Sequence, residues 1–347
     1  MHGPDLPSPP RRLSLGKLPP ELMERYLFGM TGARSADVVV EPALGLDFGV
    51  VRLGRRSSPR FLIVSSDPIT GVRERVGWYA VNVSANDVAT SGNSPQFIQS
   101  IILLPEEAKE EDVRVLSSEM DETARALGIS IVGGHTEVSL GMHRPIVVTT
   151  AFALADSYVT AAGAKKGDSL MMTKTAGVEG TAILAAERRM RARLGTRIAE
   201  AAEANFRKMS VVKEAAGAYA TGAVHAMHDC TEGGVLGALF EMGTASGLGL
   251  EVEGGKIPVS PETAGVCEVA KADPLKLISS GTLLLAVERG REVEVRDAVA
   301  AAGSVATQIG TFAGRKVVLR RGSSEEVVAT APSDELWRLH REAGSRW

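Results

Sequence analysis

Residues 75–92 read RVGWYAVNVSANDVATSG, and the interpretation of the whole chain starts from this stretch. Apolar residues recur at helical spacing from Val76, and Asp87 continues the same stripe. Gly92 follows as a residue type that commonly ends a helix. A carboxylate on an apolar stripe is informative, because a buried carboxylate must be paired or must bind a metal ion. The stretch therefore predicts a covering helix that also carries a site residue.

Around this helix the sequence predicts β-strands and a second amphipathic helix. The expected strands are 37–41, 48–53, 61–65, 96–104, 129–132 and 145–154, after a short helix over 21–28. The second long helix is expected over 106–127, with Val113, Leu116, Met120, Ala124 and Leu127 toward the core. Its first turns are acidic, as suits the helix dipole. Strands with two covering helices predict an α/β sandwich domain.

The second half predicts another α/β unit, so the fold class is α/β (α+β) with two domains. Its expected strands are 169–173, 223–228, 282–287, 306–310 and 316–320, and its expected helices are 178–193, 198–219, 235–246 and 291–302. Alanine, glycine and lysine replace the apolar pattern near 156–166. We therefore expect an N-terminal domain over 14–156 and a C-terminal domain over 157–347, preceded by a disordered tail over 1–13.

Composition excludes several classes of protein. The 347 residues carry a net charge of −3 and only 4% aromatic side chains, so neither a basic nucleic-acid surface nor a base-stacking platform is expected. No apolar stretch of about 18 residues predicts a membrane span, and the first residues lack the apolar core of a signal peptide. Cys230 and Cys267 form no CxxC pair. We expect a cytoplasmic protein with reduced thiols.

Five acidic residues stand apart from the solvated charge runs. They are Asp47, Asp67, Asp87, Glu137 and Asp229, each beside glycine or small residues where a strand or helix ends. Any one of them alone is equally well explained as the cap of a turn or a helix. As a set, with asparagine and threonine nearby, they suit Mg²⁺, which prefers oxygen ligands and shares its remaining positions with water and phosphates.

Glycine pairs and one lysine extend the same hypothesis. Gly133-Gly134 follows a predicted strand, so its backbone N–H groups could approach an anion, although a tight turn explains it as well. Lys17 follows Gly16 and is either a surface lysine or a mobile cation that folds over phosphates. The histidines lack the HExxH spacing of a zinc site, and only His135, inside the glycine turn, stays a candidate.

In chain order these motifs resemble the aminoimidazole ribonucleotide synthetase superfamily. The motifs are GK at 16–17, GLD at 45–47, SSD at 65–67, NDVATSG at 86–92, GGHTE at 133–137 and DCTEGG at 229–234. The superfamily includes that purine enzyme, thiamine-monophosphate kinase, selenophosphate synthetase and a hydrogenase maturation factor that dehydrates a carboxamide. The stretches 86–92 and 273–284 most resemble the maturation factor.

The resemblance implies two α/β domains and a homodimer whose N-terminal domains pair their sheets, with ATP in a cleft near that interface. The catalytic candidates are Lys17, Asp229 and His135, the metal ligands are Asp47, Asp67 and Asp87, and the nucleotide-binding candidates are Asn86, Gly133, Gly134, Thr136 and Glu137. The resemblance implies these roles for Lys17, the four aspartates, Gly133, Gly134 and Thr136, whereas His135 and Glu137 are candidates from their place in the sequence. The implied chemistry is attack of an acceptor atom on an ATP phosphate, and aspartates that hold Mg²⁺ suit it.

The chain also departs from the maturation factor. That protein carries its substrate group on a C-terminal cysteine, whereas this chain ends in AGSRW, so we do not expect the self-modifying reaction. Three functions stay open. The first is Mg²⁺-ATP-dependent activation of an oxygen on a small molecule or carrier group. The second is a small-molecule kinase of the thiamine-monophosphate kinase type. The third is a nucleotide-binding assembly partner with little turnover.

Overall fold

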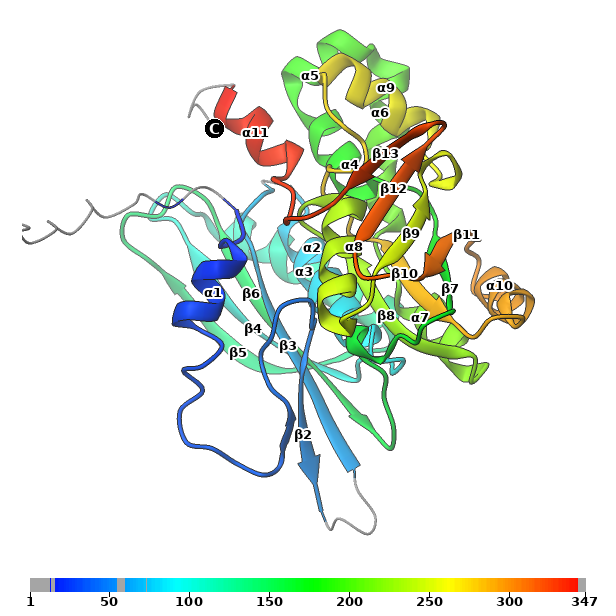
Figure 1. Ribbon diagram of the computed structural model, residues 1–347. Helices are drawn as coiled ribbons and strands as arrows, with labels where there is room; N and C mark the ends of the chain where they lie inside the picture. The colour runs from blue at the N-terminus through cyan, green and yellow to red at the C-terminus, as the bar shows by residue number, and fades with distance from the viewer. Residues whose placement is uncertain (1–12, 14–15, 55–59, 73, 343–347) are drawn as a thin grey trace, which may run out of the picture.

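The computed structural model describes residues 13, 16–54, 60–72 and 74–342. These residues form two mixed β-sheets with helices packed on them (Figure 1). The tail expected over 1–13 lies outside the described residues except for Leu13. We call the first sheet with its helices the first unit and the second sheet with its helices the second unit. No helix among the described residues combines the length and the apolar character needed to cross a membrane.

The first sheet has the strand order β1-β2-β3-β6-β4-β5. Its strands are β1 (Val38–Val40), β2 (Gly49–Leu53), β3 (Arg60–Ile69), β4 (Phe97–Leu104), β5 (Ser130–Val138) and β6 (Ile146–Ala155), with α1 (Pro20–Tyr26) before them. The strands β4 and β5 run parallel, and the helix α3 (Glu110–Leu127) makes the crossover that parallel neighbours need. The other described pairs in this sheet are antiparallel.

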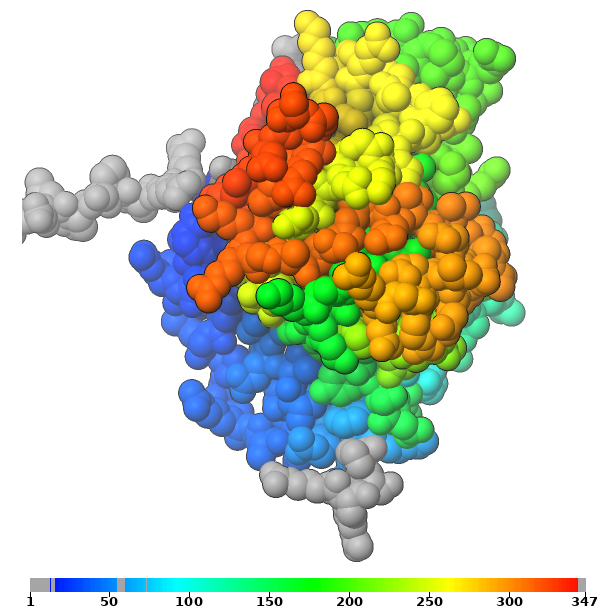
Figure 2. Space-filling view, turned by 45° about the vertical axis from the view of Figure 1, so that its right-hand side comes forward, coloured from blue at the N-terminus to red at the C-terminus, as the bar shows by residue number. Residues whose placement is uncertain are grey.

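The helix predicted from the opening stretch is α2 (Val76–Ala89). It is buried on nearly all sides, because it packs on β3 and β6 and also contacts the second unit at α7 (Val212–Ala220). One apolar core therefore runs from Ile63 in the first sheet through α2 to Val295 in the second unit. Figure 2 shows the blue residues of the first unit lying directly against the second unit.

The second sheet has the strand order β13-β12-β9-β11-β7-β10-β8. Its strands are β7 (Ser169–Thr173), β8 (Val224–Cys230), β9 (Leu250–Glu253), β10 (Thr282–Val287), β11 (Ala306–Phe312), β12 (Val317–Arg321) and β13 (Ser324–Val327). Its other helices are α4 (Val178–Ala186), α5 (Arg188–Leu194), α6 (Thr196–Glu203), α8 (Gly234–Ser246), α9 (Pro261–Ala270), α10 (Glu292–Ala301) and α11 (Glu335–Glu342). A core of apolar residues from β7, β8 and β10 packs under α8.

Some predicted elements are wrong in extent. The strand expected over 61–65 continues to Ile69, so Asp67 lies inside β3 and not after it. The helix expected over 178–193 breaks at Glu187, whose backbone is extended, and the one over 198–219 divides into α6, a 3₁₀ segment and α7. Val113 was expected in the core but is 38% exposed, because α3 buries a narrower stripe around Leu116 and Met120.

The predicted glycine turn at 133–137 is also wrong, because these residues form the middle of β5. The register between β4 and β5 shifts between Ile98 and Gln99, because β5 has the additional residue Val132 there, and this β-bulge directly precedes the glycines. At Gly134 a Cβ atom would lie 2.0 Å from the carbonyl oxygen of Ser100, and φ is 155°. The glycine is therefore required by the close approach of two strands, and this explains the motif without a phosphate.

Candidate active site between the two units

A cavity of about 600 Å³ lies between the two units, which is a typical size for a ligand pocket. Its charged and polar lining includes Lys17, Asp47, Asp67, Asp87, Glu179, His228, Asp229 and Glu232. The structure thus brings together five of the predicted site residues from parts of the chain more than 200 positions apart. They come from the segment before α1, the loop before β2, strand β3, helix α2 and the end of β8.

Asp67 and Asp87 form one wall of this cavity. Alternation along β3 points Ser65 and Asp67 to the side that α2 covers, where the Ser65 hydroxyl donates a 2.7 Å hydrogen bond to Asp87 Oδ2. Burial raises the pKa of Asp87 well above its ordinary value, and the negative charges of Asp67, Asp229 and Asp47 raise it further. The carboxylates crowd one another, which a bound cation would relieve.

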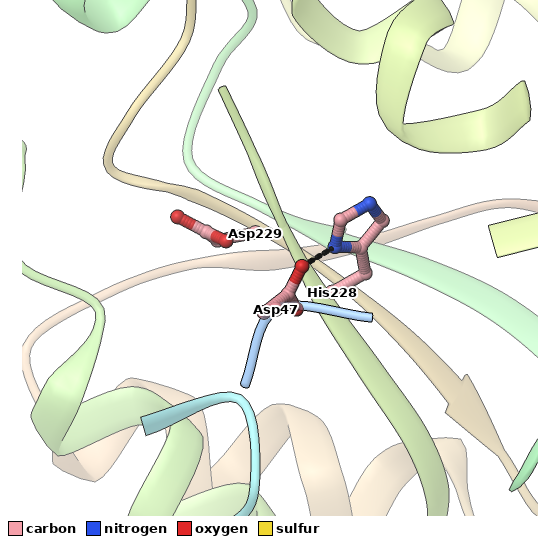
Figure 3. Close-up of side chains that lie close together, drawn as sticks. All are labelled: Asp47, His228 and Asp229. Atoms are coloured by element: carbon pink, nitrogen blue, oxygen red, sulfur yellow. Dashed lines mark ion pairs between the residues drawn. The ribbon is translucent and has the colours of Figure 1, made fainter. Parts of the chain in front are cut away.

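Asp47, His228 and Asp229 form a second wall of the cavity lining, in which the three side chains lie close together (Figure 3). The imidazole Nδ1 of His228 lies 2.6 Å from Asp47 Oδ1. Burial alone would lower the pKa of His228, but Asp47 and Glu241 outweigh it and raise this pKa to about 10. The raised pKa favours the protonated imidazole, which pairs with Asp47 and orients its carboxylate.

Gly45 explains how Asp47 reaches this place. Its φ is 77°, and a Cβ atom there would lie 2.3 Å from the carbonyl oxygen of Glu241 in α8. Only glycine lets the loop approach the helix this closely. The GLD motif at 45–47 therefore positions a carboxylate next to His228 by a backbone contact.

A chain of charges connects Lys17 to the same wall. Lys17 Nζ donates a 2.6 Å hydrogen bond to Glu241 Oε1, and Glu241 Oε2 lies 3.1 Å from His228 Nε2. The backbone N–H of Lys17 also donates to Glu232 Oε1 at 2.7 Å. Burial lowers the pKa of Lys17, but Glu241 and neighbouring carboxylates outweigh it, so the pKa is raised and the ammonium stays charged. The Lys17 side chain is 47% exposed and lines the cavity.

The carboxylates fit a hard divalent cation. Asp229 is buried, and its Oδ2 has no hydrogen-bond partner within the described part of the chain. Ligand atoms of Asp47, His228 and Asp229 lie within 4.8 Å of one another. Burial, then the charge of Asp47, raises the pKa of Asp229 well above its usual range. Mg²⁺ prefers carboxylate oxygens as ligands. The unpaired, buried oxygen of Asp229 and the neighbouring carboxylates therefore suit this ion.

The other predicted site residues lie elsewhere in this chain. Asn86 is buried and joins the two units, because its side chain donates to the carbonyl oxygen of Met209 and accepts from the N–H of Val211. The strand β5 carries Gly133, Gly134, His135, Thr136 and Glu137, which are exposed and do not line the cavity. There His135 Nε2 lies 3.1 Å from Glu137 Oε2.

Three further acidic residues, Glu179, Glu232 and Glu241, belong to the site and were not predicted as site residues from the sequence. Glu241 pairs with both Lys17 and His228. Burial would raise the pKa of Glu241, but the hydrogen bond from His228 and the positive charges of Lys17 and His228 outweigh burial and lower this pKa to about 2. Glu179 lines the cavity from α4, is 6% exposed, and its Oε2 has no partner among the described residues. Burial raises the pKa of Glu179 to about 7 although Ser280 hydrogen-bonds it. The histidine His228 was expected only to pack at a strand end, and it also belongs to the site.

Comparison with known proteins identifies the family of the chain. Residues 45–155 match the N-terminal domain of AIR synthase related proteins, and residues 165–321 match their C-terminal domain. The chain belongs to the AIR synthase related family. It is 31% identical over 264 residues to carbamoyl dehydratase HypE of Escherichia coli K12, which covers 74% of this chain and 76% of that protein. It is 30% identical over 261 residues to selenide, water dikinase of Pelobacter propionicus, covering 71% and 69%.

Solved structures of family members have the same fold. The structure of E. coli HypE, described as a hydrogenase maturation protein, superposes with a TM-score of 0.69 at 26% identity and covers 79% of this chain and 88% of that one. A HypE solved in complex with ATP superposes with a TM-score of 0.68 at 18% identity, covering 91% and 96%. The predicted two-domain, family-type fold is confirmed.

Proposed function

We propose that this chain is a cytoplasmic, Mg²⁺- and ATP-dependent enzyme that transfers a phosphoryl group to an oxygen of a small molecule or carrier group. The observation that carries this proposal is the convergence of Asp47, Asp67, Asp87 and Asp229 with Lys17 on one interdomain cavity. Phosphoryl transfer requires mostly positioning and charge neutralisation, and this residue set supplies both. Relatives named for ATP-using reactions support it, and two buried free cysteines suit a reducing compartment.

The residues have distinct proposed roles. The four aspartates hold Mg²⁺, which when bound neutralises phosphate charge and orients the polyphosphate. His228 and Glu241 keep Asp47 and Lys17 in place. Lys17 lines the cavity, and its half-exposed ammonium pairs with phosphate oxygens. Glu179 receives the proton of the attacking hydroxyl, because it is a buried carboxyl of the cavity lining whose Oε2 has no hydrogen-bond partner among the described residues and whose pKa is raised to about 7.

We propose a chemical class for the acceptor and not a particular compound. Carbamoyl dehydratase and selenide, water dikinase, to which the chain is similar, are named for different acceptors. A small-molecule kinase is therefore the second candidate, and a nucleotide-binding assembly partner with little turnover is the third.

We further propose a homodimer through the first sheet. All residues of the edge strand β5 are exposed, and Phe97 and Ile101 on β4 are 38% and 45% exposed on the sheet face opposite α2. An unpaired edge strand beside an apolar sheet face is typical of a surface that another chain covers.

Replacement of Lys17 tests the proposed function. We expect Lys17→Ala to lower the rate of ADP formation about 10²-fold, the scale of one lost contact to transition-state charge, while nucleotide affinity changes little. Coupled ADP release measures the rate, and calorimetry measures the affinity. Lys256→Ala, which removes an exposed lysine paired with Glu253, serves as the control. Equal rates in wild type and Lys17→Ala would remove Lys17 from the mechanism.

A further inference from the structure

A second cavity, of about 470 Å³, adjoins the first. The two cavities share Gly71, Val72, Arg144 and Ile183 in their linings. The second cavity extends away from the aspartates, between the start of α2 and the helices α4 and α5. A molecule in it would therefore have one end next to the proposed nucleotide site and the other end near the surface.

The floor of this second cavity is apolar. Val72 and Tyr79 are 8% and 4% exposed, and Ala182, Ile183 and Phe206 complete the floor. Two contacts fix the position of Phe206. Its ring packs edge-on against Trp78 with the ring centroids 5.1 Å apart, and the Arg75 guanidinium lies over it, 4.4 Å from the centroid of the Phe206 ring. Such a floor suits an aromatic or other apolar body.

The rim of the cavity is rich in arginine. Arg75, Arg144, Arg188 and Arg189 line it, together with Glu74, Glu187 and Glu203. Arg75 is fixed by a 2.9 Å hydrogen bond to Glu203 and by a left-handed backbone with φ of 57°. Arg188 and Arg189 are exposed, and in the part of the chain that the structure describes they form no ion pair. Their guanidinium groups are therefore available for a carboxylate or a phosphate.

Ile183, which lines both cavities, lies one turn of α4 beyond Glu179, so Glu179 is close to the lining that the two cavities share. Glu179 lines the first cavity, and its charge raises the pKa of the Tyr79 hydroxyl in the floor of the second, after the larger effect of burial. A substrate bound on the apolar floor would thus present its inner end to Glu179 and to the first cavity.

Building on the proposed function, we propose that the second cavity is the acceptor site and that the acceptor is a small molecule with an apolar or aromatic body and a terminal anionic group. The anion lies at Arg188 and Arg189, and the acceptor hydroxyl lies at Glu179. The hydroxyl oxygen forms the new bond to the γ-phosphorus of ATP, its proton passes to the Glu179 carboxylate, and the bond to the β–γ bridging oxygen breaks so that ADP leaves with that electron pair.

Calorimetric titration of small anions tests this site. The full chain is saturated with Mg²⁺ and a non-hydrolysable ATP analogue, and phenyl phosphate, benzoate and benzyl alcohol are titrated separately. We expect saturable binding of at least one anion with a dissociation constant of about 1 mM or lower, and weaker binding of the neutral alcohol. The stronger of the two anions identifies whether the terminal group is a phosphate or a carboxylate.

Two variants locate the binding. Ala186→Trp fills the second cavity, and the double variant Arg188→Ala, Arg189→Ala removes two exposed charges at its rim; neither changes a residue that lines the first cavity. We expect both variants to bind the anion at least about tenfold more weakly, which is the scale of one lost charge-assisted hydrogen bond. The affinity for the nucleotide should stay unchanged. The double variant decides the matter if Ala186→Trp does not fold.

The inference is overturned if neither anion binds, if the alcohol binds as tightly as the anions, or if the double variant binds them like wild type. Failure of the nucleotide to bind would instead contradict the proposed function. In that case the same anion titration without nucleotide still decides whether the second cavity recognises anions.

Discussion

Glu179 and Glu241 are each the one charged residue in an otherwise apolar helix, α4 and α8. That pattern is visible in the sequence and could have identified both as site residues, because an acid surrounded by apolar positions must be buried with a partner. The aspartates were predicted because small residues flank them where strands end. His228 could not be predicted, since its role depends on Asp47 and Glu241, which only the fold brings together.

At the scale of the residue we predict that Glu179→Gln changes the pH dependence of turnover. A general base must be ionised, and the pKa of Glu179 is raised to about 7, so wild-type kcat/KM should rise as pH increases through about 7. In Glu179→Gln this rise should be absent and the rate should fall by about 10²–10⁴-fold. Steady-state kinetics across this pH range measures both effects.

Glu179→Asp is the matched variant, because it keeps a carboxyl group and should retain a pH-dependent rise with a reduced rate. A Glu179→Gln profile that rises like the wild-type profile would show that another group takes the proton.

The elements of the sheets were predictable where the pattern was long and regular. The strand β7 and the strand β10 have the expected bounds, because both faces of each are buried and the apolar runs are continuous. The helix α9 and the strand β13 were not predicted. The strand β13 is wholly exposed and polar, so it carries no apolar pattern. The helix α11 was missed although Leu336, Leu339 and His340 recur at helical spacing, and it packs in a separate core with α4, α5 and α9.

At the scale of the element we predict that Asp334 holds α11 at the cavity. Its carboxylate accepts hydrogen bonds from the N–H groups of Gly233 at 2.6 Å and Leu336 at 2.7 Å. In Asp334→Asn an amide nitrogen replaces one carboxylate oxygen and cannot accept a hydrogen bond. One of the two buried N–H groups therefore loses its partner, which lowers the free energy of unfolding by about 1–3 kcal/mol. We expect faster amide hydrogen exchange over residues 335–342 and weaker nucleotide binding, because Leu336 and Trp337 line the cavity.

Glu342→Gln in the same helix is the control, because the exposed pair of Glu342 with Arg338 should contribute less than about 1 kcal/mol. Unchanged exchange of α11 in Asp334→Asn would contradict the anchoring role of Asp334.

At the scale of the whole molecule, the sequence patterns and motifs predicted two α/β units and the family resemblance. They predicted only part of the site between the two units. The join expected near 156–166 lies between the end of β6 and the start of β7, while the domain limits themselves stay a prediction. The sequence could not show that GGHTE belongs to a bulged edge strand, because the contact of Gly134 with Ser100 joins two strands separated by a helix.

We predict that the chain sediments with the mass of two 36.5 kDa chains. Ile101→Glu, which places a charge on the open face of the first sheet, should weaken the dimer at least about tenfold, because a buried unpaired charge is costly. Val305→Glu is the matched control, because Val305 is 68% exposed in the second unit. A wild-type protein that sediments as a single chain would contradict the proposed dimer.

The central claim is that the clustered aspartates bind a nucleotide through Mg²⁺. The most direct measurement is calorimetric titration of a non-hydrolysable ATP analogue into wild type and Asp67→Asn, each with and without Mg²⁺. We predict binding to wild type that requires Mg²⁺, and loss of that binding in Asp67→Asn with an unchanged unfolding temperature, since Asp67 is only half-buried. Equal binding without Mg²⁺, or equal binding by the folded variant, would contradict the account.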